Sequence, residues 1–93
     1  MSFTIRIPKK YFYRLREICQ SYNSYRECIM RELEKKYNFK IYNAEKAHDM
    51  RLYEHTAPRP IYIIIFREEN KNLEELAKKL GKSKYELIMS IFK

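Results

Sequence analysis

The sequence predicts a small α+β protein, mostly helical, in which a two-stranded antiparallel ribbon lies on four helices. Three observations lead to this prediction. Two short segments show the composition or alternation of a strand, helical periodicity follows each of them, and an internal repeat relates the two halves. The 93 residues are expected to form a single domain (1–93), which consists of a first unit (1–37), a connection (38–59) and a second unit (60–93).

The first strand is expected over residues 2–8, where apolar and polar side chains alternate strictly. One face holds Phe3, Ile5 and Ile7, and the other holds Ser2, Thr4 and Arg6. From Lys9 onward apolar residues recur three and four apart, which indicates a helix that Asn23 would close in the left-handed conformation. Ser24 and Glu27 form a capping box, so a second helix is expected to begin there.

The connection is less regular, with one short helix that Asn43 would cap and that the prolines at 58 and 60 would end. In the second unit, "IYIIIF" (61–66) is a strand by composition, and "NLEELAKKLG" (72–81) is a helix with Gly81 at its C-terminal cap. Ser83 and Glu86 form a second capping box before the last helix, "LIMSIF". The acidic pairs Glu68–Glu69 and Glu74–Glu75 are interpreted as charges at helix starts.

The repeat relates the two units at an offset of 58 residues, which becomes 59 after one extra residue in the second turn. The aligned pairs include Ile5 with Ile63, Leu15 with Leu73, Asn23 with Gly81, Ser24 with Ser83 and Glu27 with Glu86. One unit has a lone strand whose backbone groups need hydrogen-bond partners, and the strand of the other unit can supply them. A two-stranded ribbon is marginal in water, so the four helices are expected to cover its apolar face.

With "FTIRIPKKYFYRLREI" in front and "ELAKKLGKSKYELIMSIF" behind, the chain resembles the ribbon-helix-helix transcription regulators, the group of Arc and the methionine repressor. The resemblance covers about three quarters of the sequence. Those proteins are normally homodimers, so two units in one chain imply a single-chain pseudo-dimer, a tandem form found among regulators of archaeal filamentous viruses. The resemblance implies a sequence-specific regulator of transcription, such as a repressor, that inserts its ribbon into the major groove of double-stranded DNA.

The resemblance also implies which residues touch DNA. Base edges would be read by Ser2, Thr4 and Arg6 and by their counterparts Pro60, Tyr62 and Ile64. The backbone at the start of each second helix would bind a phosphate, at Ser24, Tyr25 and Arg26 and at Ser83, Lys84 and Tyr85. Lys9 and Lys10 are expected to reach the DNA backbone just beyond the ribbon. The strand at 61–66 has an ambiguous register because both of its faces are apolar. A slip of one residue would turn Ile61, Ile63 and Ile65 outward.

The net charge of +8 favours a polyanionic partner, with nucleic acid ahead of an anionic membrane, over a merely solvated Lys/Glu surface. The major groove is wide enough for a two-stranded ribbon, and arginine commonly reads guanine there. No glycine-rich phosphate loop, nucleophile motif or metal-ligand set is present, so we expect no enzyme activity, cofactor or metal. No run of 18 apolar residues or leader is visible, so we expect a cytoplasmic protein, in the host cell if it is viral.

Two other functions remain open at this stage. One is a protein-interaction module such as an antitoxin or an inhibitor, with 38–59 as its binding segment, and the other is non-specific packaging of double-stranded DNA. Self-association on DNA is also left open. Cys19 and Cys28 are assigned to the core, with a disulfide between them as the alternative if the host is a hyperthermophile. His48 and His55 are seven residues apart and are taken as surface residues.

Overall fold

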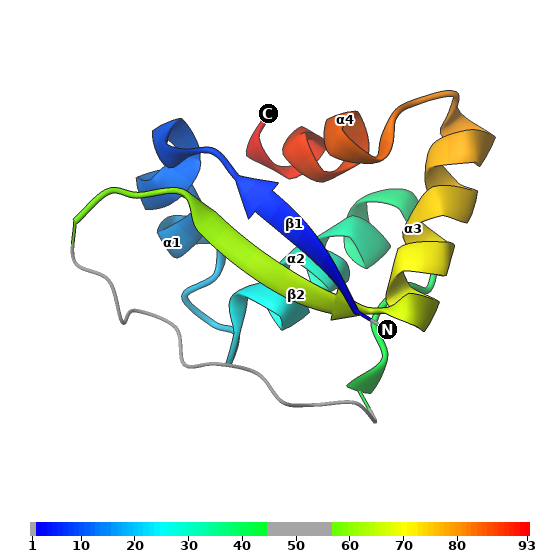
Figure 1. Cartoon of the computed structure of the whole chain (residues 1–93), viewed down its shortest axis with the longest axis horizontal. Coiled ribbons are helices and arrows are strands. Elements are labelled where there is room, and N and C mark those ends of the chain that lie inside the picture. Colours follow the sequence, from blue (N-terminus) through cyan, green and yellow to red (C-terminus); the bar gives the residue numbers. More distant parts are fainter. Residues whose placement is uncertain (1, 45–56) are drawn as a thin grey trace.

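The computed structural model describes residues 2–44 and 57–93, and the predicted α+β class is confirmed for this part of the chain. It holds one two-stranded antiparallel sheet and four α-helices, and most of its regular structure is helical (Figure 1). The elements in chain order are β1 (Ser2–Ile7), the short 3-10 helix η1 (Lys9–Tyr11), α1 (Phe12–Ile18), α2 (Tyr25–Tyr37), β2 (Ile61–Phe66), α3 (Arg67–Leu80), α4 (Lys84–Met89) and the 3-10 helix η3 (Ser90–Phe92).

The ribbon pairs β1 with β2 along their whole length, from Ser2 opposite Phe66 to Ile7 opposite Ile61. β1 stops one residue earlier than predicted, at Ile7, since Pro8 has no N–H to donate to a ladder. The isoleucines at positions 5, 7, 61, 63 and 65 are all buried. The register of β2 is therefore the one that keeps its odd-numbered residues inside, and the alternative slip by one residue is wrong.

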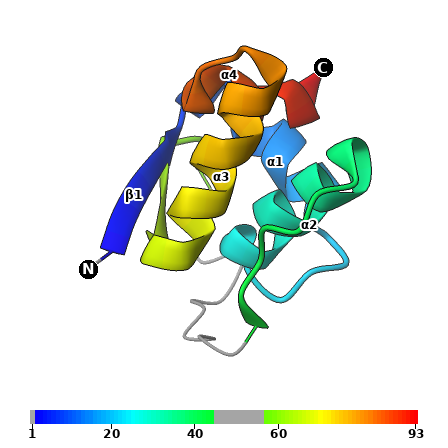
Figure 2. The same cartoon turned by 90° about the vertical axis from the view of Figure 1, so that its right-hand side faces the viewer.

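The helices cover the apolar face of the ribbon and leave its other face open. Figure 2 shows the ribbon at one side of the molecule, with the helices packed on the other. Both units contribute to a single cluster of buried side chains beneath the strands. Its fully enclosed members include Ile7, Phe12, Leu15, Ile29, Leu33, Ile65, Leu73 and Leu87. Neither strand could stay paired in water without this shared core.

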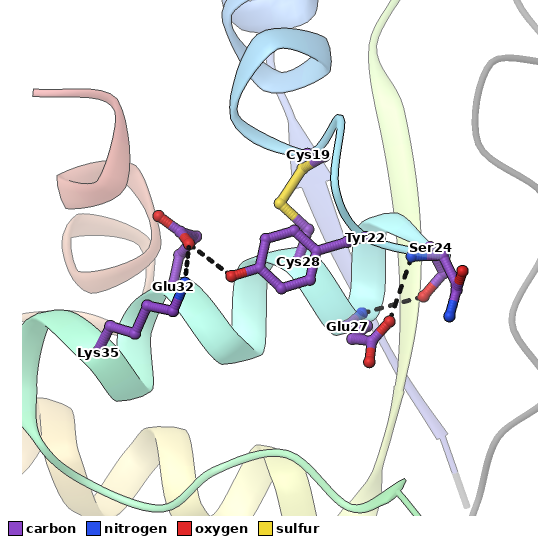
Figure 3. The surroundings of a disulfide bond; sticks show 8 residues. Cys19, Tyr22, Ser24, Glu27, Cys28, Glu32 and Lys35 are labelled. Carbon is purple, nitrogen blue, oxygen red and sulfur yellow. Dashed lines mark hydrogen bonds and ion pairs between the residues drawn. A yellow bond between two sulfur atoms is a disulfide. The ribbon is translucent and has the colours of Figure 1, made fainter.

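The first unit differs from the prediction at the end of its first helix. α1 ends at Ile18, not at Asn23, and Asn23 does not have a positive φ. Cys19 and Cys28 are both buried and form a disulfide whose Cα atoms lie 5.4 Å apart (Figure 3). The two cysteines are therefore core residues, as predicted. They also form the disulfide that the sequence offered as an alternative. The connecting turn begins at Cys19, and the disulfide ties it to α2.

The second unit has a longer first helix than predicted. α3 begins at Arg67, directly after β2, and ends at Leu80. Gly81 closes it with φ 67°, as expected, and the N–H of Lys82 donates to the carbonyl of Ala77 at 2.9 Å. The first acidic pair lies in the first turn of α3, as predicted. The placement of Glu74–Glu75 at a helix start is wrong, because both lie in the middle of α3.

A buried ion pair joins the two units and the beginning of the connection. The Nε of Arg26, on α2, lies 2.9 Å from the carboxylate of Glu69, on α3, and the two side chains are 4% and 0% exposed. Glu69 also accepts the N–H groups of Phe66 and Asn43, each at 3.0 Å. The guanidinium lies 4.8 Å from the ring centres of Tyr42 and Phe66. This network places residues 41–43 against both units.

The short helix expected after Asn43 lies outside the described residues, as do His48 and His55. Asn43 itself is bonded to α3 through Glu69 and, with its side-chain amide, through Glu68. The preceding residues are held by α2, where Glu34 accepts the N–H groups of Ile41 and Tyr42 at 2.8 and 2.9 Å. Partial burial alone would raise the pKa of Glu34, but these N–H groups and the guanidinium of Arg31 hold the pKa below its usual value.

Candidate nucleic-acid interface

The open face of the ribbon carries four of the six predicted base-reading side chains. Thr4 and Arg6 are exposed on β1, and Tyr62 and Ile64 are 61% and 57% exposed on β2. Thr4 lies directly opposite Ile64, and Arg6 lies directly opposite Tyr62. These side chains share one face because residues two apart on a strand point the same way. The structure thus gathers on one surface the residues that the sequence assigned to two distant segments.

The other two predicted positions are Ser2 and Pro60. Ser2 pairs with Phe66 through its place in β1, and its side chain is not among those described. Pro60 comes just before β2 and is half-buried, so it stands beyond the end of the paired region. Among the six predicted positions, the side chains shown to be exposed on the ribbon are therefore the four at positions 4, 6, 62 and 64. We call these four residues the ribbon face.

Lys9 and Lys10 follow the C-terminal end of β1, in the 3-10 helix η1, and both are exposed. The ammonium group of Lys10 lies 5.1 Å from the ring centre of Tyr11. This places two positive charges three and four residues beyond Arg6. Flexible lysines in this position suit a sequence-independent contact with a phosphate backbone.

The start of α2 is largely enclosed. Ser24 is buried, and its hydroxyl accepts the N–H of Glu27 at 3.1 Å, which confirms it as the helix cap (Figure 3). The carboxylate of Glu27 accepts the N–H of Asn23, so the bond of the capping box falls one residue earlier than expected. The side chain of Arg26 is buried in the ion pair with Glu69 and is not at the surface. The phosphate contact predicted for Ser24, Tyr25 and Arg26 can involve backbone N–H groups, and that remains a prediction.

The start of α4 forms the reciprocal capping box that the sequence predicts. Ser83 and Glu86 exchange bonds between side chain and backbone N–H, both at 3.1 Å. The N–H of Ser83 and then its hydroxyl lower the pKa of Glu86. Lys84 donates to the amide oxygen of Asn70, and its ammonium lies 5.7 Å from the ring centre of Phe3. Tyr85 is 55% exposed, whereas Lys84 is half-buried.

Two interactions around the site had no signal in the sequence. The pairs Arg26–Glu69 and Asn70–Lys84 join residues 43 and 14 positions apart, and each pair includes a buried polar side chain. Local periodicity cannot identify partners at such distances; only the assembled fold does. Glu69 and Asn70 lie in the first turn of α3, directly after β2, so the two bonds hold the end of the ribbon against α2 and α4.

Within residues 2–44 and 57–93 no group of three or more potential metal ligands occurs. No helix in these ranges has the length and apolar composition needed to cross a membrane.

Comparisons with known proteins place the chain in a viral family. No protein-family model matches it, and no solved structure does. It is 57% identical over 93 residues to "Uncharacterized protein 25" of Sulfolobus islandicus filamentous virus (isolate Iceland/Hveragerdi), and the match covers all of both chains. This relative comes from a virus with an archaeal host, the setting that the sequence suggested. With this identity over the full length, the chain belongs to the same family as that viral protein.

Proposed function

We propose that the chain is a sequence-specific, double-stranded DNA-binding regulator of transcription, built as a tandem ribbon-helix-helix pseudo-dimer. In this proposal the ribbon face enters the major groove and the basic side chains around it contact phosphates. The proposal rests on the agreement between the sequence repeat and the pairing of the strands, on the open ribbon face and on the charge of the chain.

The observation that carries the proposal is the register of the ribbon. The repeat aligns Ile5 with Ile63, and the ribbon pairs the same two residues. A two-fold axis through this pair would carry Thr4 onto Tyr62. It would also carry Ile64, which pairs with Thr4, onto Arg6, which pairs with Tyr62. The repeat depends on the apolar pattern, the caps and the turn, whereas the register is a property of the backbone pairing. That independent agreement supports two equivalent units around one axis, which is the arrangement of a ribbon-helix-helix dimer.

The helix starts agree with the same relation. α2 begins at Tyr25 and α4 begins at Lys84, which the 59-residue offset aligns, and each start is capped by a serine. This supports the same strand–helix–helix order in both units.

The size and chemistry of the ribbon face fit the major groove. A two-stranded ribbon can enter that groove, which is about 12 Å wide. Arg6 offers a fork of donors for guanine, and the hydroxyls of Thr4 and Tyr62 can donate or accept. The net charge of +8 supplies the attraction to phosphates that DNA binders share.

Binding to labelled duplex fragments of the genome that encodes the chain tests the proposal. We expect the protein to select a few fragments, to lose affinity steeply as salt rises, and to lose selectivity in Arg6→Ala. The preferred fragment should bind Arg6→Ala roughly 5- to 150-fold more weakly. Arg14→Ala is the matched control, since Arg14 is an exposed arginine of α1 whose partner is Glu17.

Three results would contradict the proposal. Arg6→Ala could retain the parental selectivity, which would exclude groove reading by the ribbon face. All fragments could bind equally in the presence of competitor DNA, which would favour non-specific packaging. No fragment could bind, which would favour a protein-interaction module such as an antitoxin or inhibitor.

A further inference from the structure

The two strands present different chemistry at equivalent positions of the ribbon face. The axis through the Ile5–Ile63 pair relates Arg6 to Ile64 and Thr4 to Tyr62. At the first of these positions a guanidinium on one side of the axis corresponds to a branched alkyl group, 57% exposed, on the other. The backbone of the ribbon is therefore symmetric in its pairing, whereas the surface that it offers is not.

We propose that the ribbon recognises a DNA site that is not a true inverted repeat. In one half of the site a guanine contacts Arg6. In the other half a thymine stands at the equivalent position and contacts Ile64. This inference rests on the proposed function and adds to it the kind of DNA sequence that is bound.

The chemistry of Arg6 and Ile64 decides this difference. Arginine binds O6 and N7 of guanine through two hydrogen bonds, and the alternative bases do not offer the same pair of acceptors. An isoleucine has no donor or acceptor in its side chain, so base edges there lose hydrogen bonds to water without gaining new ones. The methyl group of thymine is the apolar feature of the major groove that such a side chain can contact favourably.

The other equivalent pair, Thr4 and Tyr62, differs less in chemistry and more in reach. Each side chain carries a hydroxyl that can donate or accept a hydrogen bond, so each tolerates several bases. Tyr62 extends the hydroxyl beyond an aromatic ring and is 61% exposed. The strongest contrast between the two half-sites is therefore expected at the positions of Arg6 and Ile64.

The distribution of charge also favours unequal half-sites. Residues 1–43 carry ten basic and four acidic side chains, a net of +6, whereas residues 60–93 carry seven and five, a net of +2. The half of the DNA under the first unit is expected to be held more strongly by its phosphates. Base discrimination by Arg6 then acts in the half-site that is bound more tightly.

Selection of bound sequences from a random duplex pool tests the inference. The parental protein is compared with Tyr62→Thr/Ile64→Arg, which gives β2 the ribbon-face residues of β1. Both substituted side chains are exposed, so the core is left intact. We expect an asymmetric motif for the parent and an inverted repeat with guanine in both halves for the double variant. The double variant should prefer that repeat over the parental site by roughly 5- to 150-fold.

Two further variants keep the result interpretable. Leu80→Arg adds the same charge at the far end of α3, on a partly exposed residue, and should keep the parental motif. The motif selected by Arg6→Ile is expected to lose guanine from the first half-site. This variant replaces the double variant as the test if a thermal melt shows that the double variant does not fold. A parental motif that is a perfect inverted repeat, or guanine retained by Arg6→Ile, overturns the inference. No enriched motif with the parent overturns the proposed function itself.

Discussion

The two units differ in how the turn between their first and second helices is stabilised. In the first unit, α1 has seven residues, and a disulfide from Cys19 to Cys28 ties the turn after it to α2. In the second unit, α3 has fourteen residues and ends in a glycine turn at Gly81. The repeat aligns the two cysteines with Ala77 and Leu87, both of which are buried. A covalent bond in one unit thus corresponds to two buried apolar side chains and a left-handed glycine in the other.

The comparison separates the features that the two units share from those that differ. Both units keep the strand, the inward isoleucines and the serine that caps the second helix. The turn between the helices varies, because several kinds of bond can hold two helices together. The joint between the units has its own chemistry, the Arg26–Glu69 pair, which the repeat does not duplicate: the counterpart of Arg26 is the exposed Tyr85.

The largest effect is expected from breaking this joint. Arg26→Met leaves the carboxylate of Glu69 buried without its cation, and losing one partner of a buried pair typically destabilises a protein by about 3–5 kcal/mol. Unfolding in urea measures this free energy. Arg14→Met is the control, because the Arg14–Glu17 pair is exposed and should change stability little. Equal stability of the two variants would show that the two units are held together without the ion pair.

A smaller effect is expected from the bond that distinguishes the first unit. Cys19→Ala/Cys28→Ala opens a loop with a sequence separation of 9, and the chain-entropy account of loop closure gives a loss of about 2–3 kcal/mol. Amide hydrogen exchange should show α1 opening more often, with α3 changed only by the fall in global stability. The parental protein treated with a reductant should behave like the variant. Faster exchange in α3 than in α1 would contradict the comparison.

The smallest effect is expected at the turn of the second unit. Gly81 has φ 67°, and a Cβ there would meet no atom within 4 Å, so Gly81→Ala introduces backbone strain without a clash. We expect a loss of about 1 kcal/mol in thermal or urea unfolding. Gly81→Asn should lose less, because asparagine tolerates this conformation and Asn38 adopts it with φ 52° at the end of α2. Identical stability of Gly81→Ala and the parent would remove the role given to the glycine.

Much of the ribbon and of the candidate site could be predicted from the sequence, because the signals there are local. Alternation in the first strand and the match with its later copy placed Thr4, Arg6, Tyr62 and Ile64 on one face, as the structure has them. The caps at Ser24 and Ser83 were also visible, since their acidic partners follow three residues later.

The parts that the sequence did not reveal depend on partners far apart in the chain. The early start of α3 follows from Glu69, whose carboxylate binds the N–H of Phe66 and pairs with Arg26. The turn that follows α1 at Ile18 is tied to α2 by the disulfide of Cys19 with Cys28, a pairing that the sequence offered only as an alternative. The buried pair of Arg26 with Glu69 likewise has no local signal, because the two residues lie 43 positions apart.

The central claim, that the ribbon face lies in the major groove, is tested most directly by methylating the bound DNA with dimethyl sulfate. The reagent modifies N7 of guanine in the major groove and N3 of adenine in the minor groove, so it distinguishes the two. With the preferred fragment, the account predicts protection of at least one guanine N7 by the parent, lost in Arg6→Ala and kept in Arg14→Ala. Protection confined to adenine N3, or guanine protection that survives Arg6→Ala unchanged, would contradict it.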